Sequence, residues 1–300
     1  MDDGVREKLQ RAGRVAKEAR AFGVTLIREG ASVLDIAERI EGFIRERGAK
    51  PGFPTCISLD YVAAHYTPTH DDPLVLRRGN LVKLDLGAQV DGYIADTAIT
   101  VEVGSRNWTN LIRASEVALE TAIEVCRPKT PTRLIGAAIE RAIESHGFKP
   151  ISNLTGHTIE RYKLHAGKSI PNVGGASSHG GGDVIEAGDT VAIEPFATNG
   201  GGKVDGRKTG NIYRLLRTKD VKPAATRDFL KRIEESFHTL PFAERWCYAF
   251  DPKASVHLSR LLRAGLVMTY EALLDVGGGM VSQTEHTMIV DDDGVEVTTR

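Results

Sequence analysis

Cysteine is scarce in this chain, and its distribution excludes a cross-linked fold. The 300 residues contain three cysteines, Cys56, Cys126 and Cys247, which are odd in number and far apart in the sequence. A disulfide scaffold requires paired cysteines, and a thiolate zinc site requires a cluster of them. The sequence therefore predicts neither, and this cysteine usage fits a reducing cytoplasm.

Long apolar runs and an excess of one charge are also absent. No stretch approaches the roughly 20 apolar residues that span a bilayer, and the first residues, MDDGVREKLQ, are charged, unlike the centre of a signal peptide. The net charge is −1, with 41% apolar and 26% charged residues, a balance typical of a globular protein with a sizeable core. We expect a cytoplasmic protein with no membrane association and no dedicated nucleic-acid site.

The chain does contain an internal repeat. LDIAERIEGFIRERGAKP, ending at Pro51, aligns with LIGAAIERAIESHGFKP, ending at Pro150. The isoleucines recur at every fourth position, which predicts one face of an amphipathic helix, and a glycine follows where helices commonly end. A further helix is expected before each segment, over 5–22 and 107–126. The matching pairs are Ile36 and Ile135, Ile40 and Ile139, Glu41 and Glu140, Ile44 and Ile143, Gly48 and Gly147, Lys50 and Lys149, and Pro51 and Pro150.

A second pair of segments extends the repeat. VLRRGNLVKLD, ending at Asp85, aligns with VIEAGDTVAIE, ending at Glu194, and each predicts a turn followed by a strand that places an acid at the same position. Any two helix–turn–strand units share an apolar pattern, so an accidental similarity remains an alternative. Identity at glycine, Lys-Pro and acidic positions favours duplication.

The duplication predicts the fold class. We expect an α+β protein of two similar halves, related by a pseudo-twofold axis, with antiparallel sheets covered by helices. Residues 218–275 interrupt this symmetry with the helical patterns RDFLKRIEESFHTL and VHLSRLLRAGLV. We interpret them as a helical insertion subdomain, and residues 1–217 with 276–300 as the main domain.

Two acidic residues flank a short turn. The expected strands LVKLDL (81–86) and YIADTAITVEV (93–103) are separated by GAQVDG, which predicts a hairpin. Asp85 and Asp96 lie about equally far from its centre, so their side chains should lie opposite or diagonal on one face. Ionised carboxylates repel there, and a divalent cation would remove that cost. The pair alone leaves an alternative open, in which Asp85 caps a turn and Asp96 is an ordinary edge residue.

Three further residues favour a metal site. Glu194 is the repeat equivalent of Asp85, and Glu285 begins EHTMIV, a terminal strand similar to the DTAITV that begins at Asp96. His157 follows the helix of the second repeat. Four carboxylates and one imidazole suit two ions such as Mn(II), Co(II) or Fe(II), with Zn(II) also compatible. Two neighbouring ions of this kind support hydrolysis.

Five motifs, in this order and spacing, cover nearly the whole chain. They are FP with AAHYTP (Phe53–Pro54, Ala63–Pro68), KLDLG with GYIADTA (Lys83–Gly87, Gly92–Ala98), GHTIERYKLHAGKSIPN (Gly156–Asn172), AIEPFAT (Ala192–Thr198) and QTEHT (Gln283–Thr287). Together they resemble the type 2 methionine aminopeptidases, which have the "pita-bread" metallopeptidase fold. The helical insertion is similar to the one that marks type 2, and the short N-terminal region resembles the archaeal-style form.

The resemblance implies a metal-dependent methionyl aminopeptidase that removes the initiator methionine when the second residue is small. It assigns Asp85, Asp96, His157, Glu194 and Glu285 as metal ligands, with Asp96 and Glu285 shared between two divalent ions per chain. Co, Mn, Fe(II), Zn and Ni are the candidate ions. The implied partner is the N-terminus of a nascent polypeptide, near the ribosome, and the implied state is a monomer.

The resemblance also assigns residues to the substrate. His65 would position it, His165 would hydrogen-bond the carbonyl oxygen, and Glu194 would carry the proton of the attacking water. The methionine pocket would be lined by Phe53, Leu164 and Tyr270, together with the two histidines.

Some residues depart from the family pattern or have other expected roles. Thr284 stands where the family usually has Phe, and Cys56 stands where small or amide residues are usual. The loop Gly174–Asp183 is rich in glycine, and these departures concern the pocket and this loop rather than the metal site. We expect His286 to be structural, since it points away from the face of its neighbour Glu285. Surface or loop positions are expected for His70, His179, His238 and His257.

Two other functions are known for proteins of this fold. An Xaa-Pro peptidase of the same fold generally carries a sizeable domain before the first metal-binding Asp, whereas 84 residues precede Asp85 here. A non-catalytic binding protein of this fold would be expected to lose ligands, and all five candidates are present in this sequence.

Overall fold

Two pairs of helices form where apolar residues recur at about every fourth position of the sequence. In the computed structural model, which describes residues 1–175 and 182–300, the first pair is α1 (Asp3–Leu26) and α2 (Val33–Glu46), and the second is α3 (Thr109–Val125) and α4 (Thr132–Ser145). Gly48 and Gly147 follow α2 and α4 with positive φ angles of 69° and 81°, the conformation in which glycine ends a helix without strain. Within the described residues, no helix has both the length and the apolar character needed to cross a membrane.

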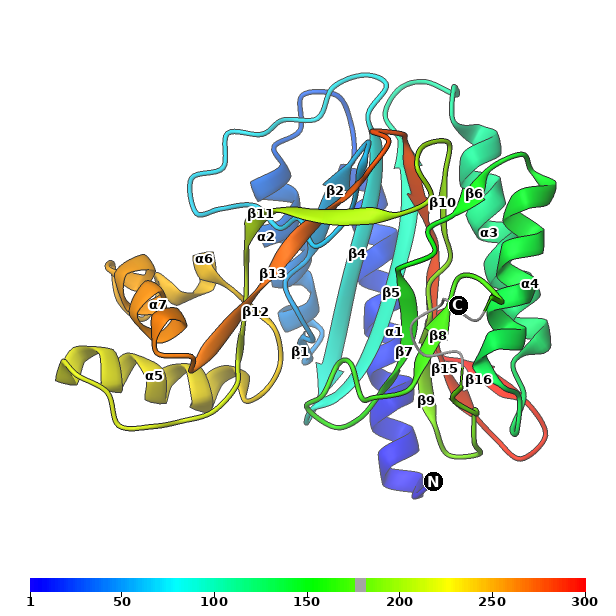
Figure 1. Cartoon of the computed structure of the whole chain (residues 1–300). Helices are drawn as coiled ribbons and strands as arrows, with labels where there is room; N and C mark the ends of the chain where they lie inside the picture. The colour runs from blue at the N-terminus through cyan, green and yellow to red at the C-terminus, as the bar shows by residue number, and fades with distance from the viewer. Residues whose placement is uncertain (176–181) are drawn as a thin grey trace.

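A nine-stranded sheet packs against both helix pairs (Figure 1). Its main path runs β1-β4-β5-β15-β9-β7-β8, with β2 beside β4 and β16 beside β15, and every pairing is antiparallel. The strands are β1 (Lys50–Pro51), β2 (Cys56–Leu59), β4 (Leu81–Val90), β5 (Tyr93–Glu102), β7 (Thr155–Ile159), β8 (Ser169–Pro171), β9 (Thr190–Ile193), β15 (Glu285–Val290) and β16 (Val295–Val297).

The two halves meet between β5 and β15. On either side of this junction lie β4 and β9, which come from equivalent places in the two repeats. Two isolated bridges, Ser32 with Val75 and Pro131 with Val184, join each repeat's helix start to its turn. The bridges occupy matching positions in the two aligned repeats, which supports duplication over an accidental similarity.

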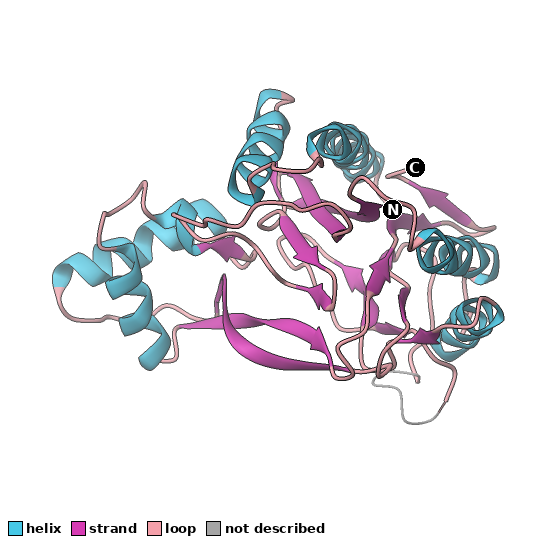
Figure 2. Ribbon diagram, turned by 90° about the horizontal axis from the view of Figure 1, so that it is seen from above, coloured by secondary structure: helices cyan, strands magenta, loops and turns pink. Residues whose placement is uncertain are grey.

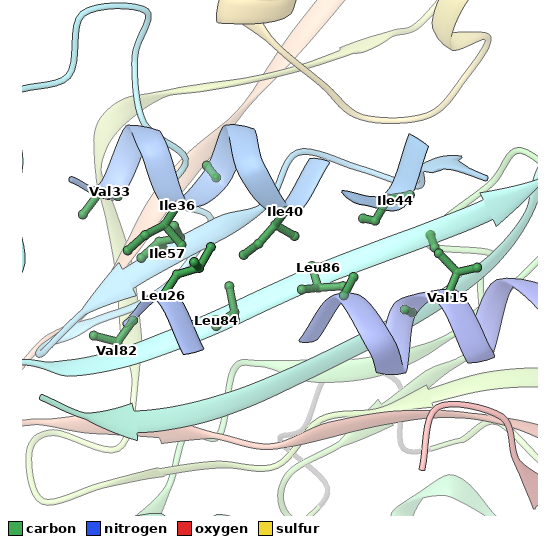
Figure 3. Packing of buried hydrophobic residues seen from close by; sticks show 14 of the residues in the cluster. Val15, Leu26, Val33, Ile36, Ile40, Ile44, Ile57, Val82, Leu84 and Leu86 are labelled. Carbon is green, nitrogen blue, oxygen red and sulfur yellow. The ribbon is translucent and has the colours of Figure 1, made fainter. Parts of the chain in front are cut away.

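The helices cover one face of the sheet. On β4, Val82, Leu84 and Leu86 point toward α1 and α2 and are fully buried (Figure 3). A second cluster joins α3 and α4 to the alternate residues of β9 and β15. Each such side chain contributes about 1.5–3 kcal/mol of burial free energy. Because side chains alternate along a strand, the residues between them point to the opposite face.

A three-stranded sheet contacts α3 and α4, and a four-stranded sheet lies beside that opposite face. A long ribbon of β11 (Val204–Leu215) and β13 (Val267–Asp275) passes across it, and in the view from above the helix layer and this ribbon lie on opposite sides of the central strands (Figure 2). The four-stranded sheet has the order β12-β11-β13-β3, and the three-stranded sheet has the order β14-β10-β6. Their remaining strands are β3 (Val62–Ala64), β6 (Lys149–Pro150), β10 (Phe196–Thr198), β12 (Phe242–Ala243) and β14 (Val281–Gln283).

The ribbon leads into a helical segment at the left of Figure 1. It contains α5 (Ala224–Phe237), α6 (Glu244–Cys247) and α7 (Ala254–Arg263), which share a separate apolar cluster. The helical region expected over 218–275 ends earlier than that range, because 267–275 form β13. The alternating segment VMTYEALLD pairs with β11 along its length, which is strand geometry rather than helix geometry.

Candidate metal centre

The hairpin of β4 and β5 brings its two aspartates together. Asp85 is paired with Ala98, and Asp96 with Gly87, so the carboxylates are diagonal neighbours on the face away from the helices. The turn is tighter than expected: β4 continues to Val90, and only Asp91 and Gly92, with φ angles of 52° and 86°, reverse the chain.

Strands from the end and the middle of the chain add the other candidates. Glu285, the first residue of β15, is paired with Ala98 of β5, and Ala98 is paired on its other side with Asp85 of β4. The methyl group of Ala98 is therefore the side chain that lies between Asp85 and Glu285. His157 on β7 is paired with Ala192 on β9, and Glu194 follows directly after β9. Three separate parts of the sequence thus place polar groups on one face.

The candidate ligand atoms converge. One atom from each of Asp96, His157 and Glu285 lies within 4.8 Å of the other two. The Nε2 atom of His157 is 3.8 Å from Oδ2 of Asp96 and 3.8 Å from Oε1 of Glu194. Gln283 Nε2 donates to Glu194 Oε2 at 3.2 Å and to Glu285 Oε2 at 3.4 Å. One amide is therefore the hydrogen-bond donor shared by two of the carboxylates.

The carboxylates are electrostatically unsatisfied without a cation. Desolvation by burial raises the pKa of Asp85 to about 7, and the pKa of Asp96, Glu194 and Glu285 is raised well above the ordinary range by burial and then by the neighbouring carboxylates. In the described part of the chain, Asp85 Oδ1, Asp96 Oδ1 and Glu285 Oε1 are buried acceptors without a hydrogen-bond partner. Buried acceptors normally have partners, and divalent cations would satisfy all three.

Three histidines on this face are held neutral. Desolvation lowers the pKa of His157 to about 4 and also lowers the pKa of His65 and His165. The rings of His157 and His165 have centroids 4.4 Å apart, and those of His65 and Tyr270 are 5.4 Å apart. His65 has a φ of 64°, a left-handed conformation that carries strain and often occurs at functional sites. Neutral imidazoles are available as metal ligands and hydrogen-bond partners.

All ten side chains nominated from the sequence line one pocket of about 470 Å³ of empty space. They are the five ligand candidates Asp85, Asp96, His157, Glu194 and Glu285, the histidines His65 and His165, and the apolar-wall candidates Phe53, Leu164 and Tyr270. Gly87 makes room for the wall, because a Cβ atom there would lie 2.4 Å from the Phe53 ring.

The sequence did not reveal every wall residue. Pro241, from the helical segment, and Ile212, from β11, also line the pocket, and neighbouring Leu240 packs with Phe53 and Leu164. No motif or spacing pointed to these residues, because their contacts depend on how the helical segment folds back. Cys56, treated above as a departure, lines the pocket as well, since it is paired with Asp85.

Several secondary expectations have clear outcomes. Thr284 is not among the pocket-lining residues, because its hydroxyl forms a 2.9 Å hydrogen bond with Ser115 of α3. His286 is buried and bonded to Thr299 at 2.8 Å, as expected of a structural residue. The expectation of a surface position was wrong for His257, which is 4% exposed and stacked on Phe229.

His70 and His238 are exposed, as expected. His179 and most of the loop 174–183 lie outside the described residues.

These residues fit a divalent metal centre. Oxygen-rich sets with one imidazole favour ions such as Mn(II), Fe(II) or Co(II), and the unpartnered acceptors require a cation to be satisfied. Asp96, His157 and Glu285 are close enough together to share an ion, and Asp85 and Glu194 reach the same pocket. The site can therefore hold metal beside a partly apolar pocket.

Comparison with known proteins agrees with this chemistry. The profile of metallopeptidase family M24 matches residues 7–292. A methionine aminopeptidase of Archaeoglobus fulgidus is 46% identical over 300 residues and is covered completely, as is this chain. The solved structure of a thermophilic Arx1 has a TM-score of 0.89 at 20% identity, over 99% of this chain and 91% of that one.

A methionine aminopeptidase structure from Thermotoga maritima has a TM-score of 0.72 at 22% identity, over 100% of this chain and 98% of that one. Similarity at this level concerns the fold. The pita-bread architecture and the resemblance to archaeal-style methionine aminopeptidases, both expected from the motifs, are confirmed. The chain belongs to metallopeptidase family M24.

Proposed function

We propose that this chain is a type 2 methionine aminopeptidase, which hydrolyses the bond after the initiator methionine of newly made proteins when the second residue is small. The observation that carries the proposal is the pocket itself, where buried carboxylates that need a cation lie beside an apolar wall. A methionine aminopeptidase that is 46% identical over the whole length supports the same activity.

Two divalent ions would be held by Asp85, Asp96, His157, Glu194 and Glu285, with Asp96 and Glu285 shared. Bound there, they would supply Lewis acidity toward the scissile carbonyl and an activated water at neutral pH. Mn(II), Fe(II) and Co(II) suit the ligand set, and Zn(II) and Ni(II) remain candidates.

The protein's own groups then orient the substrate and move a proton. Glu194, which lines the pocket, can take a proton from the attacking water and pass it to the leaving amine. His165, whose ring centroid lies 4.4 Å from that of His157, would hydrogen-bond the carbonyl oxygen. His65, fixed by its strained backbone and 3.3 Å from the carbonyl oxygen of Glu271, positions the peptide at the reacting bond.

Phe53, Leu164 and Tyr270 select the methionine side chain. Two aromatic rings and a leucine form a wall that suits an unbranched thioether, which adapts its shape and makes favourable sulfur–aromatic contacts. Crowding by the histidines and carboxylates around the scissile bond leaves room for a small second residue.

The remaining assignments belong to the same proposal. The main domain comprises 1–217 and 276–300, and 218–275 are the type 2 insertion, with β13 as its connection back to the ribbon. The substrate is the N-terminus of a nascent chain near the ribosome in the cytoplasm, and the protein acts as a monomer. No observation on the described residues favours the Xaa-Pro or the non-catalytic alternative.

Methionine release tests the proposal. Chelator-stripped protein is incubated with a Met-Ala-Ser peptide, and Mn(II), Co(II), Fe(II), Zn(II) or Ni(II) is added back separately. Met-Leu-Ser and Ala-Pro peptides are the controls for the second residue and for Xaa-Pro activity. We expect metal-restored release from Met-Ala-Ser alone. Folded protein that releases no methionine with any ion would refute the proposal.

A further inference from the structure

A buried ion pair joins the helical insertion to the first half of the chain. Glu41 lies on α2 and Arg245 on α6, and their side chains are each 2% exposed. The two residues are 204 positions apart in sequence. Arg245 Nη2 donates to Glu41 Oε1, and the indole Nε1 of Trp246 donates to the other carboxylate oxygen at 2.6 Å. Both oxygens of Glu41 are therefore engaged by consecutive residues of the insertion.

The pair is part of a closed ring of hydrogen bonds. The backbone N–H of Thr55 donates to Glu41 Oε1 at 3.1 Å, and Arg245 Nη1 donates to the hydroxyl of Thr67 at 2.6 Å. That hydroxyl donates in turn to the carbonyl of Thr55 at 2.9 Å. A second bond from Arg245 Nη1 reaches the carbonyl of Pro68 at 3.3 Å. The ring thus ties α2 and α6 to the two ends of the segment that contains β2 and β3.

Thr55 and Thr67 lie next to residues of the pocket in the sequence. Thr55 is two residues after Phe53, and Thr67 is two residues after His65. Both Phe53 and His65 line the pocket, and His65 has the strained φ of 64°. Strained conformations persist only where their surroundings over-determine them, and the ring supplies fixed contacts immediately beside this one.

We propose that Glu41 and Arg245 are positioning residues that hold Phe53 and His65 in register with the metal ligands, so that the insertion sets the geometry of the methionine pocket. This inference rests on the proposed function. It gives the insertion a role in the reaction, although neither residue of the pair is among those that line the pocket.

A role as structural reinforcement alone is the competing explanation. Buried ion pairs can often be replaced by apolar residues with little loss of stability, whereas removing one partner leaves an uncompensated charge. Burial raises the pKa of Glu41, and Arg245 opposes that rise, so the carboxylate depends on its partner. A double replacement of the pair therefore separates positioning from folding.

The test compares Arg245→Met, the double variant Glu41→Leu with Arg245→Met, and the control Arg227→Met. Arg227 pairs with Asp220 in the same insertion at 3.4 Å, but the two side chains are 53% and 75% exposed. Steady-state methionine release gives kcat and KM, calorimetric titration with Mn(II) gives metal affinity, and hydrogen exchange by mass spectrometry follows the peptide 53–68.

We expect the double variant to remain folded and to bind Mn(II) like the wild type. Its kcat/KM should fall by about 10²-fold, the usual scale for a small displacement of positioning groups, with KM raised because Phe53 moves. Amides of 53–68 should exchange faster in both Glu41/Arg245 variants and at the wild-type rate in Arg227→Met.

The outcomes distinguish the explanations. A fall in apparent kcat with unchanged KM and exchange would mean a smaller folded fraction and would overturn the positioning role. Wild-type kinetics in the folded double variant would overturn it too. If the wild-type protein releases no methionine, the proposed function fails. The rate of amide hydrogen exchange in residues 53–68 still shows whether the Glu41–Arg245 pair orders this segment.

Discussion

The metal-free protein should lose stability as the pH rises from about 5 to neutrality, and Asp85 makes this loss measurable. Burial raises the pKa of Asp85 to about 7 in the folded chain, against about 3.9 in an unfolded one. The folded state therefore holds a proton that the unfolded state has released. A group whose folded pKa is raised contributes stability that is lost as the pH climbs through that pKa.

The size of the effect follows from the shift. Between about pH 5 and 7, a carboxyl with a folded pKa of about 7 contributes a loss of about 2 kcal/mol, and above that range its contribution changes little. For a chain of this length, that corresponds to a fall in Tm of about 4 °C. Asp96, Glu194 and Glu285 have pKa values raised in the same direction, so Asp85 gives a lower bound for the cluster.

Other groups titrate in this window, and the design must subtract them. Burial lowers the pKa of His157 to about 4, which contributes a slope of opposite sign, because the unfolded state then binds more protons. Metal-free Asp85→Asn retains His157 but lacks the carboxyl. The quantity to measure is the difference in Tm between metal-free wild type and metal-free Asp85→Asn across the window.

Differential scanning fluorimetry at several pH values gives this difference. We expect the wild type to fall by about 4 °C relative to Asp85→Asn. Excess Mn(II) should abolish the fall, because metal binding requires ionised ligands and strengthens as they deprotonate. A difference that stays constant with pH, or the same fall in metal-saturated protein, would refute the account of the buried carboxylates.

Three further predictions concern single side chains. Asp96→Asn should weaken Mn(II) binding in calorimetry and abolish turnover, since a shared carboxylate is lost; near-normal activity at limiting metal would contradict the assignment. His65→Ala should keep its metal yet lose rate by about 10²-fold, and loss of metal would mean that His65 is a ligand. Gly87→Ala should displace the Phe53 ring, 2.4 Å from the added Cβ, raising KM and costing about 1–3 kcal/mol of stability in urea titration; an unchanged KM would show that the ring has room to move.

The sequence predicted which acidic residues share one face of the sheet, for a physical reason. Side-chain alternation along a strand and the symmetry of a hairpin place Asp85 and Asp96 together from local information alone. The repeat extends this prediction to Glu194, because Glu194 occupies the position in the second repeat that Asp85 occupies in the first. The family resemblance supplied His65, His165 and the apolar wall, for which no local periodicity exists.

The contacts of the insertion could not be predicted in this way. Pro241 and Leu240 reach the pocket through the folding of a segment whose helical pattern shows only which face is apolar. The partnership of Glu41 with Arg245 spans 204 positions, and a charged residue on a helix ordinarily indicates a solvated face. His257 misled for the same reason, because its burial depends on Phe229 and Thr226 of another helix.

The position of β15 has a consequence for synthesis. This strand lies between β5 of the first half and β9 of the second, yet it is formed by residues 285–290, near the end of the chain. Translation delivers the two halves first, each with an unpaired strand edge and without Glu285. The sheet and the ligand set are therefore completed together, once residues 285–290 have been made. A growing copy of this enzyme cannot process other chains before these residues are in place, and until then its two open edges must be kept from pairing with other strands.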